Sequence, residues 1–180
     1  MQRALHLTVL CLLSTPRALA WLPPLAWASF IFYLSSGRLD GPDLGVFGGF
    51  LTNLAHPGAF GVFALLLVPL ARRAAHPRGG KWTGLTPEGA LWVFVGAVIY
   101  GFTDELHQAT VAGRDASVFD LLADAVGAFF VVLVVRYLGR RDATEKGLRH
   151  RLLLGLLASV GAAAISTVYS EQVGEGPWPF

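Results

Sequence analysis

The side chains most able to do chemistry lie in and between the apolar segments of this 180-residue chain. A polar run, Asp104-Glu105-Leu106-His107-Gln108, ends one apolar segment, and Asp120 and Asp124 open the next. His56 lies in an earlier apolar segment. Imidazole and carboxylate groups are the usual general acids and bases of proteins, and they also bind hydroxyl and amine groups of polar ligands. Acid–base chemistry and polar-ligand binding are therefore the first two hypotheses.

The spacing of these residues predicts shared helix faces. Asp104 and Gln108 are four residues apart, as are Asp120 and Asp124, so each pair would lie on one face of a helix. Two carboxylates on one face repel each other unless a positive charge lies between them or one is protonated. Arg114 lies in the short connection between the two segments. Its planar guanidinium can bind a carboxylate through two hydrogen bonds, so we expect Arg114 to pair with these acids.

The elements that position these residues are expected to be membrane-spanning helices. Hydrophobic residues make up 54% of the chain and charged residues 14%, whereas about 25% is charged in ordinary globular proteins. A spanning helix needs about 20 mostly apolar residues. Five segments qualify, and they predict an all-α, polytopic transmembrane bundle: Ala18 to Ser35, Phe50 to Ala71, Pro87 to about Gln108, Val118 to Leu138 and Leu152 to Tyr169. The formal net charge of +2 argues against a nucleic-acid binder.

The basic residues predict the orientation of the bundle. They cluster in residues 72–81 and 136–151, the second and fourth connections, and the positive-inside rule places both in the cytoplasm. The N-terminus is then inside and the C-terminus outside. An alternative is that Ala18-Leu19-Ala20 ends a cleaved secretory signal, which would invert the later spans. The basic clusters favour an uncleaved chain with a cytoplasmic or interfacial segment at 1–17, a four-span core at 18–138, and a basic loop, fifth span and outer tail at 139–180.

The rise per residue of an α-helix places three polar side chains at the same depth in the membrane. At about 1.5 Å per residue, Asp104 lies about 25 Å from Pro87 at the cytoplasmic end of its helix. His56 and Asp124 lie about 24 Å from Arg72 and Arg140 at the corresponding ends of theirs. The hydrocarbon core is about 30 Å thick, so all three are expected in one cavity that opens to the outer side, with Arg114 at its rim.

Glycines beside His56 predict close helix packing at this height. Pro57 has no N–H, so a carbonyl one turn earlier loses its usual partner within the helix. Gly58 and Gly61 would allow another helix or a ligand to approach closely.

A purely structural interpretation of these polar residues competes with the functional one. Any single polar residue could be a hydrogen bond between helices, and Asp120 alone could cap a helix N-terminus. The whole set is harder to explain this way, because ionised groups at membrane depth cost several kcal/mol and usually mark a functional site. The expected ligand-binding residues are His56, Asp104, Glu105, Gln108, Arg114, Ser117, Asp120 and Asp124. Their spacing demands no metal ion, and we expect no cofactor.

These motifs resemble the VanZ-like family. The resemblance rests on the polar run at 104–108, Gly113-Arg114, Ser117, the aspartates at 120 and 124, and the earlier His56, and it covers roughly residues 34–135. It implies a small multi-span protein of the bacterial cytoplasmic membrane, and the family's namesake is linked to resistance to the glycopeptide teicoplanin. This chain has Asn53, Phe60 and Asp124 where the family often has Lys, Tyr and Asn, so its site is expected to be more acidic.

Three alternative functions are consistent with these residues. The favoured one is a protein that binds or shields a membrane lipid, a lipid-linked cell-wall precursor or a lipoglycopeptide at the outer leaflet. The second is an intramembrane enzyme of the cell envelope, with Asp104, Glu105 or His56 as general base and Asp120 or Asp124 as acid. No nucleophile stands out, because Ser117 has no evident His–acid partner, so we lean against an enzyme. The third is a proton-coupled carrier, although carrier sites usually lie near the midplane.

Overall fold

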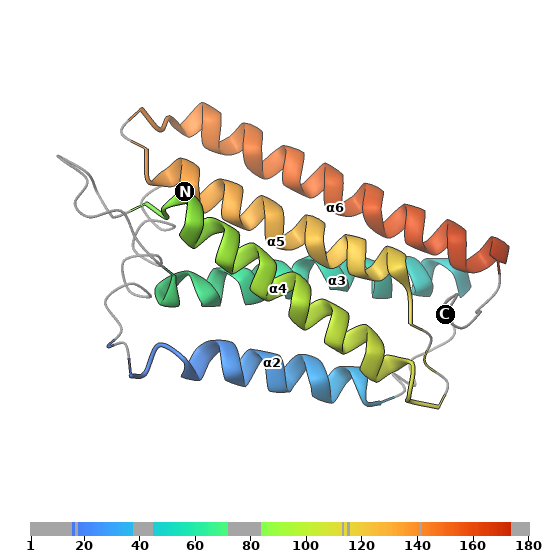
Figure 1. Cartoon of the computed structure of the whole chain (residues 1–180). Helices are drawn as coiled ribbons and strands as arrows, with labels where there is room; N and C mark the ends of the chain where they lie inside the picture. Colours follow the sequence, from blue (N-terminus) through green and yellow to red (C-terminus); the bar gives the residue numbers. More distant parts are fainter. Residues whose placement is uncertain are drawn as a thin grey trace.

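The computed structural model describes residues 16, 18–37, 45–71, 84–112, 114, 116–140 and 142–173, with side chains to residue 170. These residues form five α-helices and one short 3₁₀ helix (Figure 1). The elements are α2 (Leu22–Ser35), α3 (Gly45–Leu67), η1 (Val68–Leu70), α4 (Pro87–Gln108), α5 (Val118–Leu138) and α6 (Glu145–Val173). The all-α prediction is confirmed for the part of the chain that the structure describes.

Two helices begin and end where the sequence predicts, because their capping residues are strong. Thr86 precedes α4, and its hydroxyl accepts a hydrogen bond from the Gly89 N–H at 3.0 Å. Pro87 fills the first turn, where a missing N–H does no harm. Ser117 caps α5 by accepting from the backbone N–H groups of Phe119 and Asp120. The alternative that Asp120 is the N-cap of a helix is therefore excluded for α5, since the Ser117 hydroxyl satisfies those donors.

The other helices differ from their predicted bounds. α3 begins five residues earlier, at Gly45, and α6 begins at Glu145, within the basic stretch that was expected to be a loop. Charged residues continue a helix readily once it has left the hydrocarbon core. α2 has 14 residues, so it is about 21 Å long, shorter than a hydrocarbon core of about 30 Å. The first of the five predicted spans is thus a shorter helix within the described residues.

The remaining four helices are long and apolar enough to cross a membrane: α3 with η1, α4, α5 and α6. Large apolar side chains point outward from them, among them Leu91, Ile99, Leu122, Phe129 and Leu156. Such a surface suits lipid rather than water. The chain is therefore a membrane protein, and its orientation stays a prediction from the basic clusters.

Helices α3, α5 and α6 pack against one another, α4 packs on α5, and α2 lies at the edge against α3 and α4 (Figure 1). Glycines allow the closest approach between helices α3 and α5. A methyl group on Gly127 of α5 would collide with the backbone carbonyl of Pro57 in α3, and one on Gly61 would lie 3.3 Å from Val131 Cγ2. Gly61 therefore acts as the sequence predicts, whereas Gly58 faces open space.

Two hydrogen bonds join the middle of α2 to its neighbours. The Trp27 indole N–H donates to the carbonyl of Ala59 in α3 at 2.9 Å. The Tyr100 hydroxyl of α4 donates to the carbonyl of Ala28 at 2.6 Å. The Tyr100 ring also packs on Phe63, with ring centroids 4.9 Å apart. These contacts join α2 to α3 and α4 beside the polar residues of both helices.

Candidate functional site

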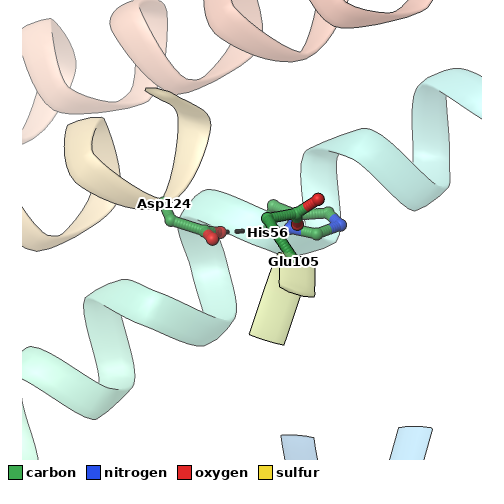
Figure 2. A group of neighbouring side chains, drawn as sticks. All are labelled: His56, Glu105 and Asp124. Carbon is green, nitrogen blue, oxygen red and sulfur yellow. Dashed lines mark hydrogen bonds and ion pairs between the residues drawn. The ribbon is translucent and has the colours of Figure 1, made fainter. Parts of the chain in front are cut away.

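Three helices bring His56, Glu105 and Asp124 to one point. One ligating atom from each residue lies within 4.8 Å of the other two. Figure 2 shows His56 from α3 and Glu105 from α4 side by side, with Asp124 of α5 reaching toward them. The His56 ring donates a hydrogen bond from Nδ1 to Asp124 Oδ1 at 3.1 Å. Residues far apart in the sequence thus form one compact group, which we call the His–Glu–Asp cluster.

The carboxylates near this point are deeply buried. Glu105 is 0% exposed, Asp124 is 1% exposed and Asp104 is 4% exposed. One oxygen of each is buried without a hydrogen-bond partner among the described residues: Asp104 Oδ1, Glu105 Oε1 and Asp124 Oδ2. A buried polar atom left unpaired costs about 1–3 kcal/mol, and more if it is charged. Three such atoms in one region mark it as unlike an ordinary set of hydrogen bonds between helices.

Neighbouring groups hold the two cluster carboxylates in place. Glu105 Oε2 accepts a hydrogen bond from the backbone N–H of Ser117 at 2.7 Å. The same serine caps α5, so one residue ties the start of α5 to α4. Gly101 makes room for the other carboxylate, because a Cβ atom there would lie 2.9 Å from Asp124 Oδ2. Both acids are therefore positioned by local features of α4 and α5.

Asp120 belongs to a different contact. Its Oδ1 accepts a hydrogen bond from the Ser166 hydroxyl of α6 at 2.6 Å. Sequence reasoning missed Ser166, although it sits with Thr167 as a polar pair inside an apolar run. Thr167 has a similar role, accepting from the Asn53 side-chain amide of α3 at 3.0 Å. For these residues the purely structural interpretation holds, because their hydrogen bonds join α6 to α5 and α3.

A pocket of about 90 Å³ lies between α2, α3 and α4, beside the His–Glu–Asp cluster. His56, Asp104, Gln108 and Arg114 supply its largest polar side chains. Gln108 donates from Nε2 to Asp104 Oδ2 at 3.0 Å, as the predicted shared face requires. The other lining residues include Ile31, Leu34, Ala59 and Phe60 on the apolar side, and Ser35 and Thr52, which sequence reasoning missed.

The predicted pairing of Arg114 with the carboxylates is wrong. Its guanidinium donates from Nη2 to the carbonyl of Leu34 at 2.7 Å and from Nε to that of Gly37 at 3.2 Å. The structure shows no ion pair between Arg114 and a described carboxylate. The physical reason is that the last carbonyls of a helix lack partners within the helix, and α2 ends beside this arginine.

The expected single cavity is thus divided into two adjoining parts. His56 and Asp104 line the pocket, while Asp124 lies behind His56 and reaches it through the hydrogen bond. His107 lies outside both parts. It pairs with Ser36 at 2.9 Å and stacks on Phe32, with ring centroids 4.2 Å apart.

Comparison with known proteins identifies a family. A family model described as VanZ/LLP1 matches residues 8–139, which include α2 to α5 and therefore the whole His–Glu–Asp cluster. No curated protein and no solved structure matches the chain. Helix α6, with Ser166, lies beyond the matched residues.

Proposed function

The chain belongs to the VanZ/LLP1 family, and from that premise we propose that it is a membrane-embedded binding protein whose pocket takes the polar head of an amphiphile. The observation that carries the proposal is the pocket between α2, α3 and α4. It joins a polar end, formed by His56, Asp104 and Gln108, to an apolar wall that includes Ile31 and Phe60. A lipid-like molecule has the same division between a polar head and an apolar chain.

The chemistry of the pocket favours a head group that donates hydrogen bonds. Asp104 Oδ1 is buried and without a partner, and a hydroxyl or ammonium group of the ligand would supply its donor. An anionic group is less favoured, because Arg114 already donates to two carbonyls of the α2 end. Sugar hydroxyls and amines therefore fit better than phosphate.

The size of the pocket limits what it can enclose. At about 90 Å³ it holds a small polar group, whereas pockets for drug-sized molecules measure about 300–1,000 Å³. A lipoglycopeptide such as teicoplanin would not fit whole. We therefore favour a lipid or lipid-linked cell-wall precursor, held by part of its head at the outer leaflet of a bacterial cytoplasmic membrane and shielded there. The outer placement rests on the basic clusters of the sequence.

Lipid retention tests this proposal. The protein is purified in mild detergent from bacterial membranes, and its bound lipids are identified by mass spectrometry. We expect one amphiphile with a hydroxyl-rich or amine-bearing head to be enriched with the wild type and lost with Asp104→Asn. His107→Ala is the matched control, because His107 lies on the same helix end but outside the pocket. Equal lipid content in the wild type and Asp104→Asn would refute the proposal.

One observation favours an enzyme as the second candidate. The hydrogen bond from His56 to Asp124 fixes the imidazole through Nδ1 and would leave Nε2 to act as a general base. Glu105, beside them, would be the acid. Lipid extracts of cells that express the wild type, His56→Ala or His107→Ala test this. If the protein is an enzyme, a converted lipid should be present in the wild type and in His107→Ala and missing from His56→Ala. Identical extracts from all three strains would exclude conversion of an abundant lipid.

A further inference from the structure

We propose that His56, Glu105 and Asp124 bind one divalent transition-metal ion, with Zn²⁺ preferred over Mn²⁺ and Mg²⁺. The inference does not depend on the head group proposed above, because the three side chains form a group of their own behind the pocket. Sequence spacing does not reveal it, since each ligand comes from a different helix. Figure 2 shows the three residues converging on one point.

The distances suit a small cation. Zn²⁺ binds histidine nitrogen and carboxylate oxygen at about 2.0–2.2 Å, which places tetrahedral ligand atoms about 3.4 Å apart. His56 Nδ1 and Asp124 Oδ1 are 3.1 Å apart, close to that spacing. All three ligating atoms lie within 4.8 Å of one another. The ion would replace the proton that His56 Nδ1 shares with Asp124 Oδ1, and that proton would be released to solvent. Side-chain shifts of about 1 Å would then close the three ligands around the ion, which would keep a fourth position for water.

Two buried oxygens lack the partner that a cation would supply. Glu105 Oε1 and Asp124 Oδ2 have no hydrogen-bond partner among the described residues, although both residues are almost fully buried. Buried charges in proteins are usually paired or coordinate metals. His56 can offer at most one positive charge to the two acids. A dication between the three side chains would balance the charge of both carboxylates and could give Glu105 Oε1 its partner.

The kinds of donor select the metal. Imidazole nitrogen suits zinc and its neighbours in the first transition series, whereas Mg²⁺ and Ca²⁺ prefer ligand sets made of oxygen. For one site of nitrogen and oxygen donors, affinity rises from Mn²⁺ to Cu²⁺ and falls again at Zn²⁺, which still binds more tightly than Mn²⁺. The cluster should therefore bind Zn²⁺ more tightly than Mn²⁺ and discriminate strongly against Mg²⁺.

The residues around the cluster orient its side chains as they do in known metal sites. Outer partners usually orient the ligands of such a site, and here the Ser117 N–H holds Glu105 Oε2 at 2.7 Å. Gly101 provides the space for Asp124. An ion can reach the cluster from the pocket, because His56 lines the pocket and its side chain is 14% exposed.

Zinc titration of the full-length protein tests the proposal. The protein carries no polyhistidine tag, is stripped with a chelator in detergent, and is titrated with Zn²⁺ by calorimetry. We expect one Zn²⁺ per chain, with affinity lowered by about 100-fold or more in His56→Ala, Glu105→Gln and Asp124→Asn, since even outer partners of metal sites account for about 10–100-fold. The control is His107→Ala, a nearby histidine outside both the cluster and the pocket, which should bind zinc as the wild type does.

A second measurement needs no variant. The melting temperature of the wild type should rise with Zn²⁺, fall back with chelator and stay unchanged with Mg²⁺, because a ligand that binds only the folded state stabilises it. The proposal is overturned if no stoichiometric zinc binds, if Mg²⁺ binds as well as Zn²⁺, or if zinc binding survives in the Glu105→Gln/Asp124→Asn double variant. A failed lipid-retention test would leave these results unaffected.

Discussion

The contact between Gly127 and Pro57 yields the sharpest structural prediction. A methyl group added at Gly127 would collide with the Pro57 carbonyl. Both partners are backbone atoms of long helices, so neither can turn aside as a side chain would. Gly127→Ala must therefore push α3 away from α5. Because His56 precedes Pro57 and Asp124 lies one turn before Gly127, the same shift would separate the hydrogen-bonded pair at the site.

The size of the effect follows from this geometry. Extra methyl groups in a packed interior typically cost about 1–3 kcal/mol, and a contact between backbones belongs at the upper end. For a chain of this length, 1 kcal/mol corresponds to about 2–4 °C in melting temperature. We expect Gly127→Ala to melt about 5–10 °C below the wild type in detergent, measured by tryptophan fluorescence, and to lose the bound amphiphile and zinc.

Gly58→Ala is the matched control. Gly58 lies next to Pro57 on α3, but a methyl group there meets nothing within 4 Å. Replacing glycine by alanine within a helix is itself favourable by up to about 1 kcal/mol. Gly58→Ala should thus melt at or above the wild-type temperature. If Gly127→Ala is as stable as the wild type, or if both variants are damaged equally, the close packing of α3 on α5 is wrong.

Four further predictions test other contacts. Arg114→Ala should lower stability by about 1–3 kcal/mol, because hydrogen bonds from a charged donor to the α2 end are lost; melting curves check this, and Arg114→Lys should recover only part of the loss. Ser166→Ala should cost about 1–3 kcal/mol, since it leaves a buried carboxylate oxygen without its donor, and an unchanged melting temperature would contradict the α5–α6 contact. Tyr100→Phe should cost about 0.5–1.5 kcal/mol and increase protease cleavage near α2; equal cleavage would contradict the anchoring of that helix. An alkaline phosphatase fused after Phe180 should be active, as a C-terminus outside requires, and an inactive fusion would reverse the predicted orientation.

The helices that the sequence predicts best are those with strong local signals. α4 and α5 begin and end at the predicted residues, because Thr86 with Pro87, and Ser117, mark their starts through their own chemistry. The start of α6 carries a similar signal, since the Thr144 hydroxyl accepts a hydrogen bond from the Gly147 N–H at 3.1 Å, but the first turns are charged and hydropathy alone assigned them to a loop. Apolar length thus locates a span in the membrane but not the full helix around it.

The height of the polar residues was predictable, whereas their partners were not. The rise per residue correctly placed His56 and Asp124 at one level, because it depends only on counting. Which side chain faces which depends on the rotation of each helix and on its neighbours. Glu105, rather than Asp104, therefore completes the cluster, and Arg114 bonds to α2 instead of to the acids.

The central claim is that the carboxylates of the His–Glu–Asp cluster serve a ligand rather than hold the helices together. Its most direct test is the melting temperature of Glu105→Gln in chelator, beside the wild type. The amide keeps an oxygen that can accept the Ser117 N–H and removes a buried charge, so we predict that the variant melts at or above the wild-type temperature while losing its response to Zn²⁺. A melting temperature several degrees below the wild type would show that the Glu105 carboxylate stabilises the fold, and would contradict the account.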